Sequence, residues 1–516
     1  MPDDTVISTD EFPEYESPFF EDPDANALRR VGVVDVGSNS VRLVVFDGAA
    51  RSPAYFYNEK LMCGLGEGLR ETGKLNPEGR ARALRAIDRF QAVAESLGTG
   101  PLAAVATAAV REAEDGPSFV EEVKARTGMT VQVIEGPEEA RLSAQGVLLG
   151  WPGSYGLVCD IGGSSMELAE IAGGKIGKCI TSPLGPQQLK GFKRGQKKAR
   201  KEHIRTIVGQ LREEIGPQSN RLFLVGGSWR AIARLDMERR NYPLHVLHEY
   251  RMSRKDVRST IKFIQNSDLE KLRAKCGISQ ARMDLVPLAS EVLKELLKTF
   301  KPVDIAVSSY GIREGLLYEQ MPQHLRDRDP LIEACRFSEA KDARLPGFGD
   351  VLFDFVKPLF KNSNKEIKRT VRAACLLHDV SWRAHPDYRA EVCFDNATRA
   401  NLGGMSHKER MFVGLALLHR YKNSRKGTRF EKLAPLMDEK SKQRAEVLGK
   451  AMRFGAMLWM QPEQSPSKLK WYPRKKVLEL KLSKDSASLF GEVAEARFNS
   501  LASSLGATAK VRFLKK

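Results

Sequence analysis

The chain has 516 residues, of which 42% are hydrophobic, so it is long enough for several domains with sizeable cores. Its formal net charge is +18, although the first 28 residues hold nine acidic residues and neither lysine nor arginine. The rest of the chain therefore carries a net charge of +27. A body this basic is expected to attract polyanions, of which nucleic acid is the most common.

Two classes of protein are disfavoured at once. No stretch approaches the ~18 consecutive apolar residues of a membrane span, and residues 1–28 lack the basic start and apolar run of a secretory signal. We therefore expect no membrane contact and a cytoplasmic location. The seven cysteines are scattered without a Cys-x-x-Cys pair, which argues against a zinc ribbon or a disulfide framework and favours free thiols.

The first ordered element is expected just after an acidic tail. Residues 1–29 contain prolines and show no periodicity, and they are interpreted as disordered. Residues 31–46 are apolar around a Gly37-Ser38-Asn39 turn, which predicts two strands. A helix is expected at about 77–97, because Asn76 can cap it and Pro77 suits its first position. Three further elements are predicted: a strand at 102–106, a helix at about 117–127 and a strand at 130–134.

The pattern of strand, turn and strand then returns at residues 156–171. Asp35-Val-Gly-x-x-Ser40 and Asp160-Ile-Gly-x-x-Ser165 share one arrangement, so one supersecondary unit is expected to occur twice. The two copies predict related α/β lobes that face one cleft. Two more apolar strands are expected at 221–225, before the turn at Gly226 and Gly227, and at 303–307.

The last third of the chain reads differently. Helical patterns rich in Lys and Arg run to about residue 460, residues 462–476 read as a loop, and residues 477–482 and 510–514 as late strands. His378-Asp379 resembles the centre of an HD-type phosphohydrolase, but no histidine lies between His324 and His378 to complete a metal set. A degenerate HD-like, mostly helical domain is therefore expected. The predicted domains after the tail are a first lobe at 30–149, a second lobe at 150–328 and this helical domain at 329–516.

The repeated turns suggest phosphate chemistry. A Gly-rich turn after a strand can direct backbone N–H groups at phosphate oxygens, and Asp35 and Asp160, at the strand ends, are placed to hold Mg²⁺. Hydrolysis of a phosphoanhydride also needs an activated water, for which glutamate is a reasonable base. Glu138 and Glu139 suit a helix N-terminus on spacing alone. Glu167 is harder to dismiss, because it is an acid in an otherwise apolar strand.

Five motifs together resemble the Ppx/GppA family of exopolyphosphatases and guanosine pentaphosphate phosphohydrolases. The motifs are Val34–Arg42, Ala106–Arg111, Gly136–Arg141, Asp160–Glu167 and Val225–Trp229. The resemblance implies an α/β fold with two actin-like (ASKHA, ribonuclease H-like) lobes around a cleft. It also implies a homodimer. The family usually reads Asp-x-Gly-Gly-Gly-Ser-Thr-Glu, whereas this chain has Ser164 for the third glycine and Met166 for the threonine, so altered loop geometry and weaker activity are possible consequences.

The resemblance also implies residue roles. Glu139 matches the catalytic base, Glu167 the second essential acid, and Asp160 a ligand, with Glu167, for Mg²⁺ or Mn²⁺. The implied substrate-binding residues are Asp35, Gly37, Ser38, Asn39, Ser40, Arg111, Gly162, Gly163, Ser164, Ser165, Gly226 and Gly227.

The expected function is hydrolysis of the terminal phosphate of inorganic polyphosphate. Guanosine pentaphosphate is the alternative substrate, because the motifs do not separate the two, and the basic charge favours the longer polymer. A phosphotransferase and a polyphosphate- or alarmone-binding regulator without turnover also stay open. The basic run at residues 190–201 fits a solvated helix face or a rail for the polyanion equally well. Nucleic acid is disfavoured as a partner, since no zinc finger, RNA-recognition aromatic motif or helix-turn-helix signature is found.

Overall fold

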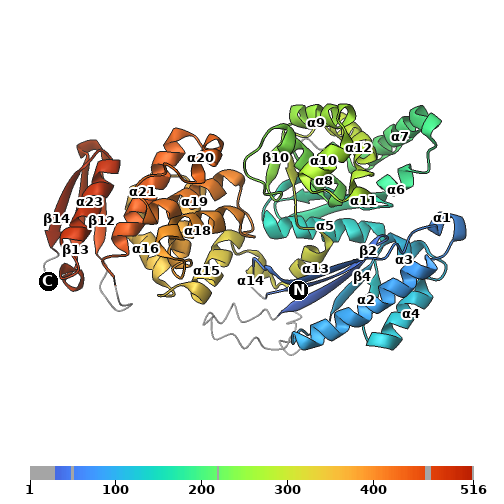
Figure 1. The fold of residues 1–516 in the computed structure, drawn as a ribbon, viewed down its shortest axis with the longest axis horizontal. Coiled ribbons are helices and arrows are strands. Elements are labelled where there is room, and N and C mark those ends of the chain that lie inside the picture. The colour runs from blue at the N-terminus through green and yellow to red at the C-terminus, as the bar shows by residue number, and fades with distance from the viewer. Residues whose placement is uncertain (1–29, 48–50, 101, 218–219, 460–466, 514–516) are drawn as a thin grey trace, which may run out of the picture. The chain divides into compact units, whose positions relative to one another are not determined.

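The computed structural model describes residues 30–47, 51–100, 102–217, 220–459 and 467–513. These residues form two compact units, of which unit 1 ends at Arg328 and unit 2 begins at Asp329 (Figure 1). The acidic segment 1–29, for which disorder is predicted, lies outside the described residues. No helix in the described part of the chain is long and apolar enough to cross a membrane.

Unit 1 contains two sheets with the same core topology. The first has the order β3-β2-β1-β4-β5, with β1 at Val31–Val36, β2 at Ser40–Phe46, β3 at Tyr55–Met62, β4 at Ala103–Ala106 and β5 at Val131–Val133. The second has the order β10-β11-β9-β6-β7-β8, with β6 at Tyr155–Ile161, β7 at Met166–Ala172, β8 at Lys175–Ser182, β9 at Arg221–Val225, β10 at Tyr250–Met252 and β11 at Ile305–Val307.

The strand pairing confirms that one unit occurs twice. β1 pairs antiparallel with β2 and parallel with β4, and β6 pairs in the same way with β7 and β9. Reading from β3 to β5 and from β8 to β11 gives the same sequence of antiparallel and parallel neighbours. The predicted α/β fold with two actin-like lobes is therefore confirmed.

Helices cover both sheets of unit 1. Their bounds are α1 Leu69–Thr72, α2 Pro77–Ser96, α3 Ala108–Glu112, α4 Gly116–Thr127, α5 Gly136–Gly150, α6 Pro186–Leu189, α7 Lys197–Ile215, α8 Gly227–Arg239, α9 Arg254–Asn266, α10 Leu269–Cys276, α11 Gln280–Met283, α12 Val286–Thr299, α13 Ile312–Gln320 and α14 Gln323–Arg326. The helix predicted at 77–97 is α2, and the Asn76 side chain accepts a hydrogen bond from the Gly79 amide as its cap.

Two crossing helices, α5 and α13, join the lobes (Figure 1). Their backbones approach closely at two glycines: a Cβ on Gly315 would lie 1.9 Å from the Leu142 carbonyl oxygen, and one on Gly146 would lie 2.2 Å from that of Gly311. α5 packs on β6, β7 and β8, and α13 packs on β1. The two helices therefore share one hydrophobic core with both sheets and fix where the strand ends of the two lobes face each other.

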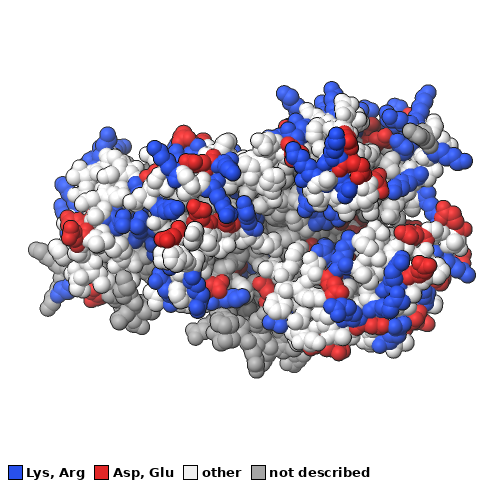
Figure 2. Space-filling view, viewed as in Figure 1, with Lys and Arg blue, Asp and Glu red and all other residues white. Residues whose placement is uncertain are grey.

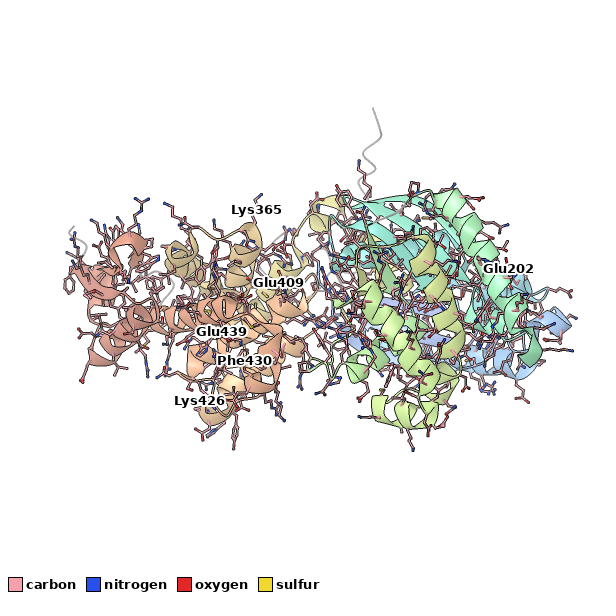
Figure 3. The ribbon with its side chains drawn as sticks, turned by 90° about the horizontal axis from the view of Figure 1, so that it is seen from above. Glu202, Lys365, Glu409, Lys426, Phe430 and Glu439 are labelled. Carbon is pink, nitrogen blue, oxygen red and sulfur yellow. The ribbon has the colours of Figure 1, made fainter. Side chains whose placement is uncertain are left out.

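Unit 2 is a helical bundle followed by a small sheet. The helices are α15 Pro330–Asp342, α16 Phe348–Val356, α17 Lys365–Leu376, α18 Pro386–Arg399, α19 His407–Tyr421, α20 Phe430–Leu433, α21 Glu439–Gly455, α22 Lys484–Ala487 and α23 Glu492–Ser504. Glu409, labelled in Figure 3, completes the capping box of α19 with Ser406, and the buried ring of Phe430 packs edge-on against Phe394.

The small sheet corrects one prediction. Its order is β12-β13-β14, with bounds Lys468–Tyr472, Val477–Leu482 and Thr508–Phe513. The two late strands are confirmed, but the loop predicted at 462–476 is wrong from residue 468 onward, where β12 lies. The five-residue alternation Lys-Leu-Lys-Trp-Tyr was masked by the proline, serine and lysine content around it; residues 462–466 lie outside the described part.

The His378-Asp379 pair of unit 2 is held by protein groups. His378 Nδ1 lies 2.8 Å from the Cys375 carbonyl oxygen, and Asp379 forms an ion pair with Arg344 at 2.6 Å. Burial lowers the pKa of His378 to about 3, so this imidazole is neutral. Within the described ranges, no cluster of three His, Cys, Asp or Glu residues is arranged to hold a metal ion.

Candidate active site

The two strand-turn-strand corners of unit 1 meet across one cavity of about 320 Å³. Most of the residues expected to bind substrate, together with two of the three predicted acids, line it. Those residues are Asp35, Gly37, Ser38, Asn39, Ser40, Glu139, Asp160, Gly162, Gly163, Ser164, Ser165, Gly226 and Gly227. Two expected residues, Arg111 and Glu167, lie behind this lining.

The two turns are built alike. The Gly37 amide donates to the Ser40 carbonyl oxygen at 3.1 Å, and the Gly162 amide donates to that of Ser165 at 3.0 Å. Both turns are open at the strand ends, where successive N–H groups can hold phosphate oxygens. The shared Asp-x-Gly-x-x-Ser pattern therefore encodes the same local structure in both lobes.

A third corner requires glycine. Gly226 has a φ of 111°, and a Cβ there would lie 2.6 Å from the Ile161 carbonyl oxygen and 3.0 Å from Asp160 Oδ1. No other residue fits so close to the second turn. The chain continues directly into α8, whose N-terminus thus adds unpaired N–H groups and a favourable dipole for anions to the cavity wall.

The two departures from the family pattern have little structural effect. Ser164 is not among the residues with positive φ, so its Cβ is accommodated without backbone strain. Met166 is fully buried in the hydrophobic core of the second lobe and does not line the cavity. The expectation of an altered loop geometry is therefore not supported at either position.

The adjacent acids at the start of α5 have different environments. Glu138 forms an ion pair with Arg141 at 2.5 Å, and Arg141 also pairs with Glu319 at 2.6 Å. Glu139 is 6% exposed and lines the cavity. The helix-end explanation thus suits Glu138, whereas Glu139 occupies a position suited to chemistry.

Three buried carboxyls perturb one another. Burial, followed by the charges of Glu167 and Asp160, raises the pKa of Glu139 well above its ordinary value. Burial and the Asp160 charge raise the pKa of Glu167 to about 8. Burial raises the pKa of Asp160, opposed by a hydrogen bond from Ser143. Three carboxyls this close cannot all ionise cheaply unless positive charge is brought to them.

These carboxyls fit a divalent cation. Glu139 Oε2 and Glu167 Oε2 are buried and have no hydrogen-bond partner in the described structure, and oxygen atoms are the ligands that Mg²⁺ prefers. A ready-made three-ligand cage is not found in the described ranges. Such an ion would therefore take one or two carboxylates, with water and phosphate oxygens as its other ligands, as is usual for Mg²⁺ at phosphate sites.

Glu167 and Arg111 lie behind the cavity lining and affect the ionisation of the acids there. Glu167 is 1% exposed, projects from β7 and accepts a hydrogen bond from Thr181 Oγ1 at 3.1 Å. Arg111 donates to the Ile134 carbonyl oxygen at 2.6 Å. Its charge lowers the pKa of both Glu139 and Glu167, against the larger effect of burial. In this structure Arg111 supports the acid cluster instead of facing the cavity.

The sequence reasoning missed a group of cations in the same cavity. The group consists of Arg42, Lys60, Arg230, Arg282 and Arg313. Arg313 pairs with Asp35 at 3.1 Å. Within the described ranges, Arg42 donates a hydrogen bond only to Asn58 Oδ1, and Arg230 only to the Gly226 carbonyl oxygen. Among the described residues, no carboxylate forms an ion pair with Arg42, Lys60, Arg230 or Arg282.

The cations without a carboxylate partner lie close enough to lower one another's pKa values. Burial, then Arg313 and Arg282, lowers the pKa of Arg230 to about 10. Burial and then Arg282 lower the pKa of Lys60, and burial and then Arg313 lower that of Arg42. This arrangement raises the free energy of the free protein and is relieved when a polyanion enters.

Some of these cations had a sequence signal. Arg42 closes the first motif, and Arg230 follows the Gly226 turn, so both could have been found from the positions of the motifs. Arg313 follows Gly311, at the turn after the apolar strand predicted at 303–307, which is β11. Lys60 and Arg282 come from an edge strand and a short helix with no motif, and only the folded chain brings them to the cavity.

The buried carboxylate of Glu314 fixes the start of α13, the segment that carries Arg313. Glu314 Oε1 accepts a hydrogen bond from the Tyr55 hydroxyl at 2.6 Å, and its Oε2 accepts one from the Gly311 amide at 2.7 Å. Glu314 is 1% exposed. It therefore ties β3 of the first lobe to the N-terminus of α13 and fixes the segment that places Arg313 beside Asp35.

Known families and proteins match this chain along most of its length. The Ppx/GppA phosphatase family matches residues 44–324, and the exopolyphosphatase C-terminal family matches residues 358–513. Exopolyphosphatase 1 of Mycobacterium tuberculosis is 34% identical over 163 residues, which cover 31% of this chain and 47% of that protein. The match thus spans about half the length of that relative. Retrograde regulation protein 2 of Saccharomyces cerevisiae is 24% identical over 442 residues, covering 76% of this chain and 72% of that protein.

Solved structures agree with the fold. An exopolyphosphatase from Cytophaga hutchinsonii superposes with a TM-score of 0.52 at 25% identity, covering 57% of this chain and 98% of that one. A Ppx/GppA family member from Aquifex aeolicus gives a TM-score of 0.50 at 23% identity, covering 57% of this chain and 97% of that one. Since the family match alone covers more than half of the sequence, this chain belongs to the Ppx/GppA phosphatase family.

Proposed function

We propose that the protein is an exopolyphosphatase that uses Mg²⁺ or Mn²⁺ to hydrolyse the terminal phosphoanhydride of inorganic polyphosphate and release orthophosphate. The observation that carries the proposal is the set of cations without carboxylate partners in the cavity that also holds Glu139 and Asp160. A chain of phosphates supplies one negative charge per unit, so it can satisfy several of these cations at once. A single phosphate monoester would leave most of them uncompensated.

The proposed chemistry assigns each group a task. The open N–H groups of the turns at Gly37 and Gly162 hold the oxygens of the terminal phosphate. Glu139, whose pKa is raised by burial, would accept the proton of the attacking water once positive charge beside the acids allows it to ionise. Asp160 and Glu167 would hold the divalent ion, which when bound neutralises charge on the transferred phosphoryl group. Arg111 keeps the acids from being fully protonated.

Guanosine pentaphosphate is the second candidate substrate. Among the described residues that line the cavity, none has an aromatic ring on which a guanine could stack. The lining instead continues with Lys60, Arg230 and Arg282, which suit further phosphates. This composition favours the polymer over the nucleotide.

The direct test compares phosphate release from long-chain polyphosphate and from guanosine pentaphosphate, with Mg²⁺, with Mn²⁺ and with a chelator. We expect faster release from polyphosphate and loss of release with the chelator. Glu139→Gln should lower kcat by about 10²–10⁴-fold while polyphosphate still binds, and Glu138→Gln, its neighbour on the same helix, should keep most activity. Faster release from the nucleotide would reassign the substrate. Tight binding without release from either would make the protein a polyphosphate- or alarmone-binding regulator.

A further inference from the structure

The C-terminal sheet of unit 2 has two chemically different faces, which its strand register defines. β12 pairs antiparallel with β13, and β13 pairs parallel with β14. On one face, Leu469 lies opposite Leu480, and both are buried. Because side chains alternate along a strand, the residues between them point to the other face.

That other face is strongly basic. Across β12 and β13, Lys468 lies opposite Lys481 and Lys470 opposite Glu479. Across β13 and β14, Glu479 lies opposite Lys510 and Lys481 opposite Arg512. The basic sheet face, as we call these residues, therefore has five cationic side chains and one carboxylate.

The single carboxylate leaves most of this charge uncompensated. Glu479 is 5% exposed and pairs with Arg512 at 3.4 Å. Lys468, Lys470 and Lys510 are exposed and form no ion pair with any described residue. The neighbouring Lys470 lowers the pKa of Lys481, which reflects two ammonium groups on adjacent strands. On the side of the molecule drawn in Figure 2, blue side chains occur over both units, with red ones among them.

The face extends through a basic turn and includes an exposed aromatic ring. Tyr472 ends β12 on the same face as Lys470, two residues away, and is 38% exposed. The turn that follows contributes Arg474, Lys475 and Lys476, all of which are exposed. An open sheet that combines rows of cations with an exposed aromatic ring supplies the two elements that bind single-stranded nucleic acid.

We propose that the basic sheet face, with Tyr472, binds single-stranded nucleic acid: the lysines contact phosphates and the Tyr472 ring stacks on a base. This binding is separate from the proposed hydrolytic function, because all of these residues lie in unit 2 and none of them lines the cavity of unit 1. The aromatic ring favours nucleic acid over inorganic polyphosphate, which has no base to stack on it.

The test measures binding of the full-length chain to a fluorescein-labelled RNA of about 20 nucleotides, longer than the ~4–16 nucleotides that single-strand-binding folds cover. Anisotropy is recorded at several salt concentrations for the wild type and three variants. Lys470→Gln/Lys481→Gln/Lys510→Gln removes charge from the face, and Tyr472→Leu removes the ring. Lys255→Gln/Arg258→Gln/Lys262→Gln, on the exposed side of α9, is the control with an equal loss of charge.

If the proposal is right, the triple sheet variant loses at least about tenfold in affinity near 0.1 M salt, and its log–log salt slope becomes shallower by about 2, or ~0.7 for each lost phosphate contact. Tyr472→Leu should weaken RNA binding by about fivefold or more and leave polyphosphate binding unchanged. Phosphate release should be retained in every variant, and an unchanged thermal melting curve should show that each one is folded.

Two outcomes would overturn the proposal. If the sheet variant and the α9 control bind RNA equally well, the sheet face does not bind the nucleic-acid strand. If the sheet variant loses RNA and polyphosphate affinity to the same extent and Tyr472→Leu changes neither, the face binds polyanions generally and has no preference for nucleic acid.

Discussion

Replacement of Arg282 by methionine tests whether the cavity cations are there for the substrate. Arg282 lines the cavity and has no carboxylate partner in the described structure, and burial lowers its pKa. In the free protein it also repels Lys60, whose pKa it lowers. Arg282→Met keeps much of the side-chain volume and removes the charge. Two effects of opposite sign are therefore expected from one substitution.

The loss of substrate binding can be estimated from a single contact. A hydrogen bond between charged groups contributes about 1.5–3 kcal/mol, so KM for long polyphosphate should rise by roughly 10- to 150-fold. kcat should change little, because Arg282 is not among the charges that most shift the pKa of Glu139, Asp160 or Glu167. The free protein should melt at a higher temperature, since a half-buried charge without a carboxylate partner has been removed.

The assay is steady-state phosphate release together with thermal melting in the absence of substrate. Arg258→Met, which removes an exposed charge on α9 outside the cavity, is the matched control and should change neither quantity. An unchanged KM for Arg282→Met would refute the substrate role of the cation. A lower melting temperature would refute the claim that its charge is uncompensated in the free protein.

Three more predictions concern the acids, the crossing helices and the second turn. The folded-state pKa of Glu167 is raised from 4.5 to about 8, so between these pH values the folded state holds a proton that the unfolded state has lost. The free energy of unfolding of the metal-free protein should therefore fall by up to about 4 kcal/mol as the pH rises from 5 to 9. In urea unfolding over this pH range Glu167→Gln should flatten the decrease, and an unchanged profile would contradict the prediction. Gly315→Ala should lower the free energy of unfolding by about 1–3 kcal/mol in the same assay, because its Cβ would meet the Leu142 carbonyl oxygen. The control Gly209→Ala has open space around its Cβ and should leave this free energy unchanged or raise it slightly. Ser164→Gly should change kcat/KM by less than about threefold, because the backbone is unstrained there; a large gain in phosphate release would show that this side chain limits the site.

The fold could be predicted from local patterns because those patterns repeat. The turn around Gly37 and its copy at Gly162 each join two apolar strands, and the register of β1 with β2 and of β6 with β7 follows directly. The edge strand β3 was not predicted: six of its eight residues are exposed, and it lacks a buried face. β12 was also missed, because five residues of alternation are too few to be recognised among flanking prolines and lysines.

Some residues of the candidate site could likewise be predicted from local sequence, whereas others depend on long-range contacts. Residues on the turns have backbone roles, which sequence encodes locally, and the structure brings them together at the cavity. The distinction between Glu138 and Glu139 could not be drawn from spacing, because both suit a helix N-terminus. It depends on Arg141 and Glu319, of which the second comes from α13, far along the chain. Long-range contacts of this kind also place Lys60 and Arg282.

The acids of this cavity repel one another, and so do its cations, so in the proposed chemistry the binding of metal and the binding of phosphate should depend on each other. Burial and mutual repulsion raise the pKa values of the Glu139, Asp160 and Glu167 carboxyls, which opposes their ionisation. Burial and the neighbouring arginines likewise lower the pKa of Arg230. A divalent ion alone would satisfy the first group and add repulsion to the second, whereas a phosphate chain alone would do the reverse. Only the two together neutralise the whole cavity, so each should strengthen the binding of the other. If the proposed function is right, the cavity should therefore bind a metal-bound chain of phosphates more tightly than either component alone.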